Sequence, residues 1–326
     1  MELRTTVAVQ DSGKKITHNT RVMFIGSCFA AEMGQKCKAG KIPVMINPHG
    51  TLFNPVSVSL ALRRFAEGYH YTKDDLYTDG SKYMSLSHYT AFTSEDSAEL
   101  IRRLNDVNTS GYDFLRSASY LFVTFGTAWL FTLREENRPV ANCHKLPSGL
   151  FSRRQAEVNE IVELWIETLN LIHKTNPEIK VVFTISPVRH LNDGAHGNQL
   201  SKARLLLAVE ELLHHEAVAG YCPAYEIFMD DLRDYRFYSS DLIHPSETGI
   251  EYVWEQFAGT YFAPATLALW HEAEKITRAM HHRITTGSKE SRLFAGTILS
   301  KIEAITKSAP YIDMETETAY FKSLIK

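Results

Sequence analysis

The sequence of 326 residues is poor in cysteine, in net charge and in long apolar runs. Its four cysteines are widely and irregularly spaced and include no CxxC pair, so the pattern indicates neither a disulfide framework nor a zinc site. A net charge of −3 provides no overall field that would attract nucleic acid or an anionic membrane. The longest nearly apolar run, Tyr120–Phe131, is too short to cross a bilayer.

Residues 1–20 contain no apolar stretch of the kind found in signal peptides. We therefore expect a cytoplasmic protein with reduced thiols. We also expect no metal, no cofactor, and neither a nucleic-acid nor a membrane partner. The sequence leaves the oligomeric state open.

Apolar residues make up 44% of the chain, which is enough for a sizeable core. Short β-branched and aromatic runs at Arg21–Ile25, Tyr120–Phe125 and Lys180–Ile185 are typical of buried strands, and helical patterns follow them. Strands that alternate with helices predict an α/β fold, with a mostly parallel sheet between two helical layers.

The remaining pattern divides the chain into further elements and two regions. We expect a main domain over residues 1–262 and a helical C-terminal extension over 263–326. The other expected strands are Leu3–Val9 and Tyr225–Phe228, residues 134–152 read as a polar loop, and the expected helices are Cys28–Lys38, Ser57–Gly68, Glu95–Asn108, Arg153–Thr175, Ser201–His215 and Ser246–Tyr261.

In parallel sheets, reactive groups gather on the loops that follow the carboxyl ends of the strands. Ser27 directly follows the first buried strand and precedes a helix. Its hydroxyl is a candidate nucleophile beside the helix N-terminus, and an ordinary helix cap is the alternative. The neighbouring Cys28 is either a second candidate nucleophile or a packing residue.

A second polar motif lies in the expected loop before the Ser246–Tyr261 helix. Asp241 and His244 are three residues apart and are followed by a proline. This spacing allows the carboxylate to hold the imidazole through Nδ1–H and leaves Nε2 free as a general base. A solvated loop without chemistry is the alternative.

Two other turns offer donors for an oxyanion. Gly126 and Thr127 directly follow the Tyr120–Phe125 strand, and Gly50 and Asn54 lie in a loop rich in proline and asparagine. Their amides and side chains are candidate oxyanion or substrate contacts. Plain turns are the alternative. The remaining candidate substrate contacts, each with a structural alternative, are His88, Asn142, His144, Arg189 and His190.

The motifs together resemble a known family. Residues 26–30 read GSCFA, and RVMFIGSCFA, INPHGTLFNP, FVTFGTAWLF and LRDYRFYSSDLIHPS follow in order. The chain is similar to the GSCFA domain family, which belongs to the SGNH (GDSL-like) hydrolase superfamily. The resemblance covers roughly residues 1–262 and implies a three-layer α/β sandwich.

The resemblance also implies roles for single residues. Ser27 matches the superfamily's nucleophile, His244 its base and Asp241 the residue that orients the base. Gly50 is the candidate for the glycine donor of the oxyanion hole. Ala128 stands where the superfamily usually has asparagine, so Thr127 or Asn54 would have to replace that donor.

The implied function is a serine acyl-ester hydrolase or acyltransferase that uses a Ser-Asp-His triad and no cofactor. Its substrate would be a small-molecule or carbohydrate ester. A non-catalytic module that binds a glycan or other ligand in the same cleft is the alternative. A third hypothesis is an assembly protein that acts through the charged helical segment 265–326.

Overall fold

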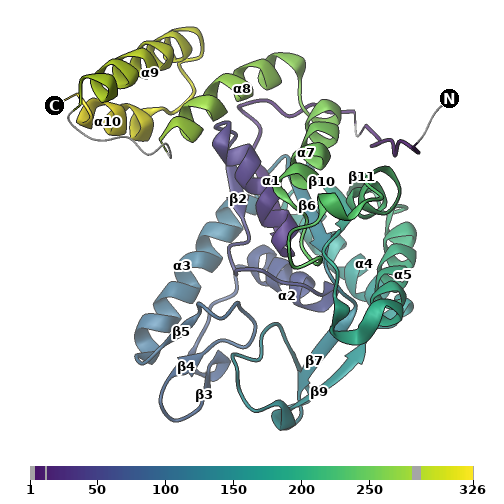
Figure 1. Ribbon diagram of the computed structural model, residues 1–326. Helices are drawn as coiled ribbons and strands as arrows, with labels where there is room; N and C mark the ends of the chain where they lie inside the picture. Colours follow the sequence, from purple (N-terminus) through teal and green to yellow (C-terminus); the bar gives the residue numbers. More distant parts are fainter. Residues whose placement is uncertain (1–3, 12, 281–287, 326) are drawn as a thin grey trace.

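A computed structural model describes residues 4–11, 13–280 and 288–325. Its centre is a parallel sheet of five strands in the order β11-β10-β6-β1-β2 (Figure 1). The strands are β1 (Val22–Gly26), β2 (Val44–Ile46), β6 (Tyr120–Phe125), β10 (Lys180–Ile185) and β11 (Val218–Cys222). The chain changes direction between β1 and β6, and such a switch point is where ligands commonly bind in open α/β sheets.

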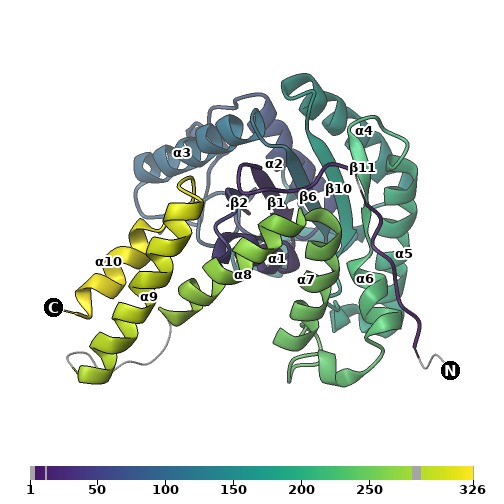
Figure 2. The same ribbon diagram turned by 90° about the horizontal axis from the view of Figure 1, so that it is seen from above.

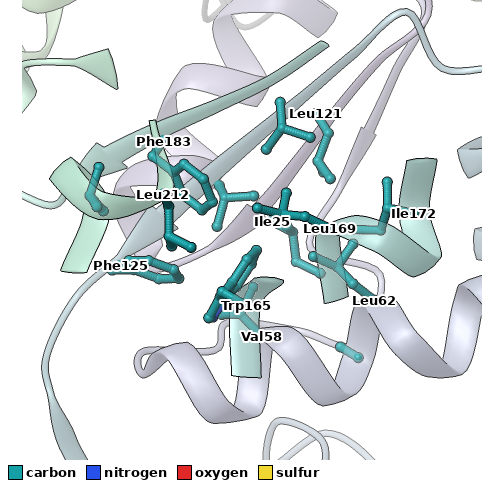
Figure 3. Packing of buried hydrophobic residues seen from close by; sticks show 14 of the residues in the cluster. Ile25, Val58, Leu62, Leu121, Phe125, Trp165, Leu169, Ile172, Phe183 and Leu212 are labelled. Atoms are coloured by element: carbon teal, nitrogen blue, oxygen red, sulfur yellow. The ribbon is translucent and has the colours of Figure 1, made fainter. Parts of the chain in front are cut away.

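Helices cover both faces of this sheet, as the sequence predicts. Helices α2 (Pro55–Ala66), α4 (Val158–Thr175) and α5 (Gly194–Leu212) lie on one face. Figure 3 shows Trp165 of α4 beside Phe125 and Phe183, whose strands are neighbours. Burial of these large rings gives the layer much of its packing energy.

The opposite face is covered by α1 (Cys28–Ala39) and α7 (Glu247–Tyr261) (Figure 2). Phe24 of β1 stacks on Phe122 of β6, and Phe257 of α7 packs against both rings. The result is the three-layer α/β sandwich that the sequence indicates.

Residues 134–152 and the start of the next helix differ from the prediction. Strands β7 (Trp129–Leu133), β8 (Arg138–Val140) and β9 (Phe151–Gln155) form a small antiparallel sheet. The prediction of a helix from Arg153 was therefore wrong, because residues 151–155 pair with β7 and α4 begins only at Val158. A second small sheet contains β3 (Tyr77–Thr78), β4 (Tyr83–Met84) and β5 (Thr93–Ser94).

The last strand of the central sheet also lies elsewhere than predicted. β11 is Val218–Cys222, whereas Tyr225–Phe228 falls in the short helix α6 (Ala224–Glu226) and the wide helical turn Ile227–Asp231. Among the described residues of the predicted strand Leu3–Val9, none is in a strand. Val7 and Val9 instead pack on the α1 side of the sheet, and Leu3 lies outside the described residues.

Two helices on the edges are longer than predicted. Helix α3 (Ser97–Leu115) is capped by the Asp96 side chain, and α5 begins at Gly194 in a segment expected to be a loop. Short helical turns occur at Lys73–Asp75, Ser148–Leu150, Leu191–Asp193 and Tyr235–Phe237.

The C-terminal residues form α8 (Pro264–Ala279), α9 (Lys289–Ser308) and α10 (Glu315–Ser323). They enclose an apolar cluster of their own, which includes Ile276, Ile302 and Phe321. Trp270 of α8 belongs to the core beneath α1 and donates a hydrogen bond to the Lys36 carbonyl at 2.8 Å. Figures 1 and 2 show α8 leading from the sandwich to α9 and α10.

The division into 1–262 and 263–326 stays a prediction. Among the helices in the described ranges, none is both long enough and apolar enough to pass through a bilayer.

Candidate active site

The turn between β1 and α1 is shaped by close backbone packing. Gly26 has φ +129°, and a Cβ atom there would overlap the Thr124 carbonyl oxygen. The Asn47 side chain accepts a hydrogen bond from the Gly26 amide at 2.8 Å. The Ser27 amide donates to the Thr124 carbonyl at 3.1 Å. These contacts fix the direction in which the next two side chains leave the strand.

The two neighbouring side chains of this turn have different surroundings. Ser27 is 1% exposed, and its Oγ has no hydrogen-bond partner among the described residues. It occupies the N-cap position of α1 without forming a side-chain cap. Cys28, the first residue of α1, is only partly buried. The Ser27 hydroxyl, which is the predicted nucleophile, is therefore enclosed in this conformation. Its role as nucleophile stays a prediction.

Asp241 and His244 form the hydrogen-bonded pair that their spacing predicts. Asp241 Oδ2 lies 2.7 Å from His244 Nδ1. The other carboxylate oxygen accepts the amides of Ile243 at 2.9 Å and His244 at 3.0 Å. The hydrogen bond with the His244 side chain is the largest of the effects that lower the pKa of Asp241 to about 2. The carboxylate is therefore charged at neutral pH and holds the imidazole by Nδ1.

Arg189 holds the loop that carries this pair. Its guanidinium donates to the Leu242 carbonyl at 3.0 Å, and its amide donates to the Ile243 carbonyl at 3.1 Å. Leu242 has φ +57°, a conformation that side chains rarely adopt, so the loop depends on such contacts. The sequence allows Arg189 to be a substrate contact or a member of a structural ion pair. The described contacts show a third role, which is support of the loop backbone.

His244 and Cys28 line the same hollow, of about 330 Å³, at the carboxyl edge of the sheet. We call it the Cys28–His244 hollow; its walls also include Thr51, Phe53, Tyr89 and His190. Beside it lies the Trp129 hollow, of about 440 Å³, which contains Trp129, Thr127 and Asn54. Phe53, His190 and Asn192 line both, so the two hollows are adjacent compartments of one cleft.

Of the three residues whose amides are predicted oxyanion donors, Thr127 lines the Trp129 hollow and Gly50 and Gly126 line neither hollow, and all three amides are engaged. The Gly50 amide donates to Asn47 at 2.7 Å, and the amides of Gly126 and Thr127 both donate to the Phe53 carbonyl at 2.8 and 3.0 Å. Binding of an oxyanion by these groups would require those hydrogen bonds to be exchanged. Their role stays a prediction.

The side chains proposed to replace the missing asparagine are also bonded. Asn54 caps α2 by accepting the Ser57 amide at 2.8 Å, which leaves its Nδ2 for a ligand. Thr127 Oγ1 lies 3.0 Å from Ser201 Oγ, and Ser201 also accepts the amide of the buried Ala128 at 2.8 Å.

His190 lies on the wall between the two hollows, as its position after β10 predicts. Its ring meets the edge of Phe53 at 6.1 Å between centroids. Burial lowers the pKa of His190 to about 4, so the ring is neutral and can exchange hydrogen bonds with a polar ligand at neutral pH.

Three predicted contact residues form a separate cluster that lines neither hollow. His88 is fully buried, and its Nδ1 lies 2.7 Å from Ser85 Oγ. Nε2 of His144 lies 2.9 Å from the Ser85 carbonyl, and Asn142 accepts the His144 amide at 2.7 Å. These contacts fit a structural role for His88, Asn142 and His144. A substrate contact by any of the three stays a prediction.

Lys202, which the sequence offers either as a substrate contact or as a structural ion pair, is a buried cation near the cleft. The ammonium group of Lys202 donates to the carbonyls of Gly126 at 2.7 Å and Ser186 at 2.6 Å, at the ends of β6 and β10. No carboxylate pairs with it in the described part of the chain. Burial lowers the pKa of Lys202 to about 7.

Sequence reasoning missed Arg153 and Asp193, which form a bidentate ion pair at 2.5 and 2.6 Å on the rim of the Trp129 hollow. The Arg153 guanidinium stacks 3.8 Å from the Trp129 ring centre. Recognition of residues 151–155 as a strand opposite Trp129 would have placed Arg153 there. Among the residues that the structure describes, no group of three or more His, Cys, Asp or Glu side chains is arranged to hold a metal ion.

Fold and site together define an α/β protein with a strand–helix turn and an Asp–His pair at the carboxyl edge of a parallel sheet. The chain belongs to the GSCFA family, whose model matches residues 21–257. Residues 273–326 match the C-terminal domain of GSCFA domain proteins.

The search among curated proteins gives no match. Among solved structures, a carbohydrate esterase family 3 protein from Talaromyces cellulolyticus is 10% identical over 78% of this chain and 99% of its own. Its TM-score is 0.35, so the likeness carries no argument about function.

Proposed function

We propose that the protein is an acyl-ester hydrolase or acyltransferase of the SGNH type. The observation that carries this proposal is the Asp241–His244 pair, because His244 lines the same hollow as Cys28, which begins α1 directly after Ser27. An imidazole held at Nδ1 has Nε2 free to take a proton from a nucleophile and return it to a leaving group.

The nucleophile comes from the β1–α1 turn, where the family resemblance favours Ser27. The first amides of α1 lie at this turn, where the helix dipole stabilises negative charge. A carbonyl oxygen that becomes negative during attack would find these donors without a metal or cofactor. The reaction is covalent catalysis, with an acyl-enzyme that passes its acyl group to water or to an acceptor hydroxyl.

We propose an O-acylated carbohydrate as the substrate class. Tyr89 and Trp129 line the two adjacent hollows and offer aromatic faces of the kind that stack on sugar rings. The rim of the Trp129 hollow carries Asn192 and Asp193, whose side chains can exchange hydrogen bonds with sugar hydroxyls.

One observation favours the second candidate function, a module that binds such a ligand without turnover. The amides of Gly50, Gly126 and Thr127 all donate to carbonyl groups, so the expected oxyanion hole is closed in this conformation. A binding module needs the cleft but does not need those donors.

Hydrolysis of aryl acetates and of acetylated oligosaccharides by the wild type and His244→Ala tests the proposal. We expect turnover by the wild type and a loss of at least about 10³-fold in the variant. His214→Ala is the matched control, because His214 is exposed and lies outside the cleft. Saturable binding of the oligosaccharide without turnover, unchanged in His244→Ala, would favour the binding module.

A further inference from the structure

Helix α5 contacts the turn that follows β6, where the superfamily usually has an asparagine and this chain has Ala128. The Ala128 amide donates to Ser201 Oγ at 2.8 Å, and Ala128 is 0% exposed. This position is therefore enclosed against α5 and does not reach the cleft. Thr127, the preceding residue, lines the Trp129 hollow.

The hydrogen bonds of Ser201 and Thr127 determine which of the two hydroxyls keeps a free proton. Their oxygens lie 3.0 Å apart, so either could donate to the other. If Thr127 donated, the Ser201 proton would have no acceptor among the described residues, although Ser201 is only 1% exposed and lines neither hollow. Buried hydroxyl protons are rarely left unpaired, so Ser201 donates and Thr127 accepts.

This arrangement makes the Thr127 hydroxyl a donor toward the cleft. Its oxygen accepts two hydrogen bonds, from Ser201 and from the Trp129 amide at 3.2 Å, which occupy both of its lone pairs. Its own proton has no acceptor among the described residues, and Thr127 lines the Trp129 hollow. A hydroxyl that can only donate selects a ligand atom that accepts, such as a carbonyl oxygen or an oxyanion.

The next residue of α5 adds positive charge at the same turn. The buried ammonium of Lys202 donates to the carbonyls of Gly126 at 2.7 Å and Ser186 at 2.6 Å, and so holds the turn to the end of β10. Burial and then the Lys202 charge lower the pKa of His190, which lines both hollows, so the field of this cation extends to the cleft. Such a field favours negative charge there.

We propose that the Thr127 hydroxyl replaces the missing asparagine as a donor to the oxyanion, and that Ser201 is the positioning residue that directs its proton to the ligand. The inference rests on the proposed acyl transfer and names one of the groups that bind its transition state. As the nucleophile bonds to the carbonyl carbon and its proton passes to His244, the carbonyl oxygen becomes negative. That oxygen accepts a hydrogen bond from Thr127, and no proton is transferred to it.

The Thr127 turn lies beside the turn that carries the predicted nucleophile. β1 and β6 are parallel neighbours, and the Ser27 amide donates to the Thr124 carbonyl at 3.1 Å. Thr127 follows three residues later and lines the compartment next to that of His244. We therefore expect an ester bound across the two compartments to bring its carbonyl oxygen to this hydroxyl.

Conservative substitutions separate these roles. Thr127→Val removes the hydroxyl at nearly constant shape, Thr127→Ser restores it, and Ser201→Ala removes the group that orients it. Asn54→Ser is the matched control, because Asn54 lines the same hollow and serine keeps the cap of α2 while removing the amide donor. Thr184→Val controls for the loss of a buried hydroxyl, since Thr184 Oγ1 has no partner among the described residues.

The experiment measures kcat and KM for p-nitrophenyl acetate and the inhibition constant of phenylboronic acid, which forms a tetrahedral anion on a nucleophilic hydroxyl. The full-length wild type, the single variants and the double variant Thr127→Val/Ser201→Ala are compared. Circular dichroism melting shows that each variant is folded. If Ser201→Ala does not fold, the comparison of Thr127→Val with Thr127→Ser still decides whether the hydroxyl is the donor.

We expect Thr127→Val to lower kcat about 10²-fold, with KM within about threefold of wild type, and to weaken phenylboronic acid to a similar extent. Thr127→Ser, Asn54→Ser and Thr184→Val should stay within about fivefold of wild type in kcat. Ser201→Ala should lower kcat at least about tenfold, but it should have little further effect when Thr127 is already valine, because it acts through that hydroxyl.

Several outcomes would overturn the inference and leave the proposed function standing. They are wild-type turnover in Thr127→Val, a rise in KM alone, or the larger loss in Asn54→Ser. Losses that simply add in the double variant would overturn the role of Ser201. A folded wild type that binds phenylboronic acid through Thr127 without turnover would contradict the proposed function alone. A folded wild type with neither turnover nor binding that depends on Thr127 would contradict both.

Discussion

Asp241 Oδ2 lies 2.7 Å from His244 Nδ1, although the two side chains are 45% and 52% exposed. An exposed ion pair adds little to stability, because water screens it and both side chains lose freedom. The two backbone amides that bind the other Asp241 oxygen show that the carboxylate also shapes its own loop. The pair is thus better suited to orienting an imidazole than to stabilising the fold.

We expect Asp241→Asn to lower kcat about 10³-fold with little change in melting temperature. The amide oxygen of asparagine can still accept the two backbone amides, but a neutral partner no longer stabilises the charged imidazole. Steady-state kinetics and thermal melting measure the two effects. Asp234→Asn is the control, because Asp234 also accepts a backbone amide, that of Arg236 at 2.9 Å. Equal losses in both variants would contradict the prediction.

We expect Gly26→Ala to destabilise the fold by at least about 3 kcal/mol. The added methyl group would overlap the Thr124 carbonyl in a strand pair of the central sheet, at a φ angle that alanine avoids. Urea denaturation measures the change. Gly259→Ala is the control, because a Cβ there meets nothing within 4 Å on helix α7, and it should stabilise by about 0.5–1 kcal/mol. A Gly26→Ala protein as stable as wild type would show that the turn can relax.

Stability should fall as the pH drops below about 6.5. Burial is the main effect that lowers the pKa of His49 to about 3 and that of His88 well below its usual range. Both rings stay neutral in the folded state, whereas in the unfolded chain they take up protons below about pH 6.5. Their contribution is complete above that pH and is lost on acidification.

His49→Phe should remove part of this acid sensitivity, because neither ring nitrogen of His49 has a hydrogen-bond partner among the described residues. We expect the loss of unfolding free energy between pH 7 and pH 5 to be about 2 kcal/mol smaller than in wild type. Denaturant titration at several pH values measures it. The exposed His214→Phe should leave the pH dependence unchanged, and the same dependence in both variants would exclude His49 as its source.

Arg189→Ala should lower kcat about tenfold and increase amide hydrogen exchange in residues 239–244. The guanidinium supports the loop that carries His244 through the Leu242 carbonyl. Arg233→Ala is the control, since that side chain is exposed and lies 3.8 Å from Asp230. A rise in KM alone, with unchanged exchange, would instead make Arg189 a substrate contact.

The sequence predicts the centre of the fold well because buried parallel strands leave a strong local pattern. The runs at Tyr120–Phe125 and Lys180–Ile185 correspond to β6 and β10 without a change of bounds. β9 was missed because it carries two exposed arginines in succession, Arg153 and Arg154, and its pairing with β7 depends on residues some twenty positions away. Tyr225–Phe228 has the composition of a strand but no room at the sheet edge, since Val218–Cys222 occupies that place.

In the site, too, the sequence pattern predicts where elements lie but not how single side chains are placed. The pattern of strand, turn and helix brings Asp241, His244 and the β1–α1 turn to one edge, but it does not reveal that Ser27 is enclosed while Cys28 lines the hollow. Similarly, the alternating segment around His88 does not reveal that its ring packs against His49, with centroids 4.2 Å apart. Contacts between distant segments set both outcomes.

Helix α8 has a practical consequence for anyone preparing shorter versions of the protein. The first family match ends at residue 257 and the second begins at residue 273. The gap between them includes the first half of α8. Trp270 is seated in the core beneath α1, whereas Ile276 belongs to the cluster with α9 and α10. A chain cut at either limit would expose one of these two apolar surfaces to water. Heating should therefore melt the sandwich and the C-terminal helices together in one transition.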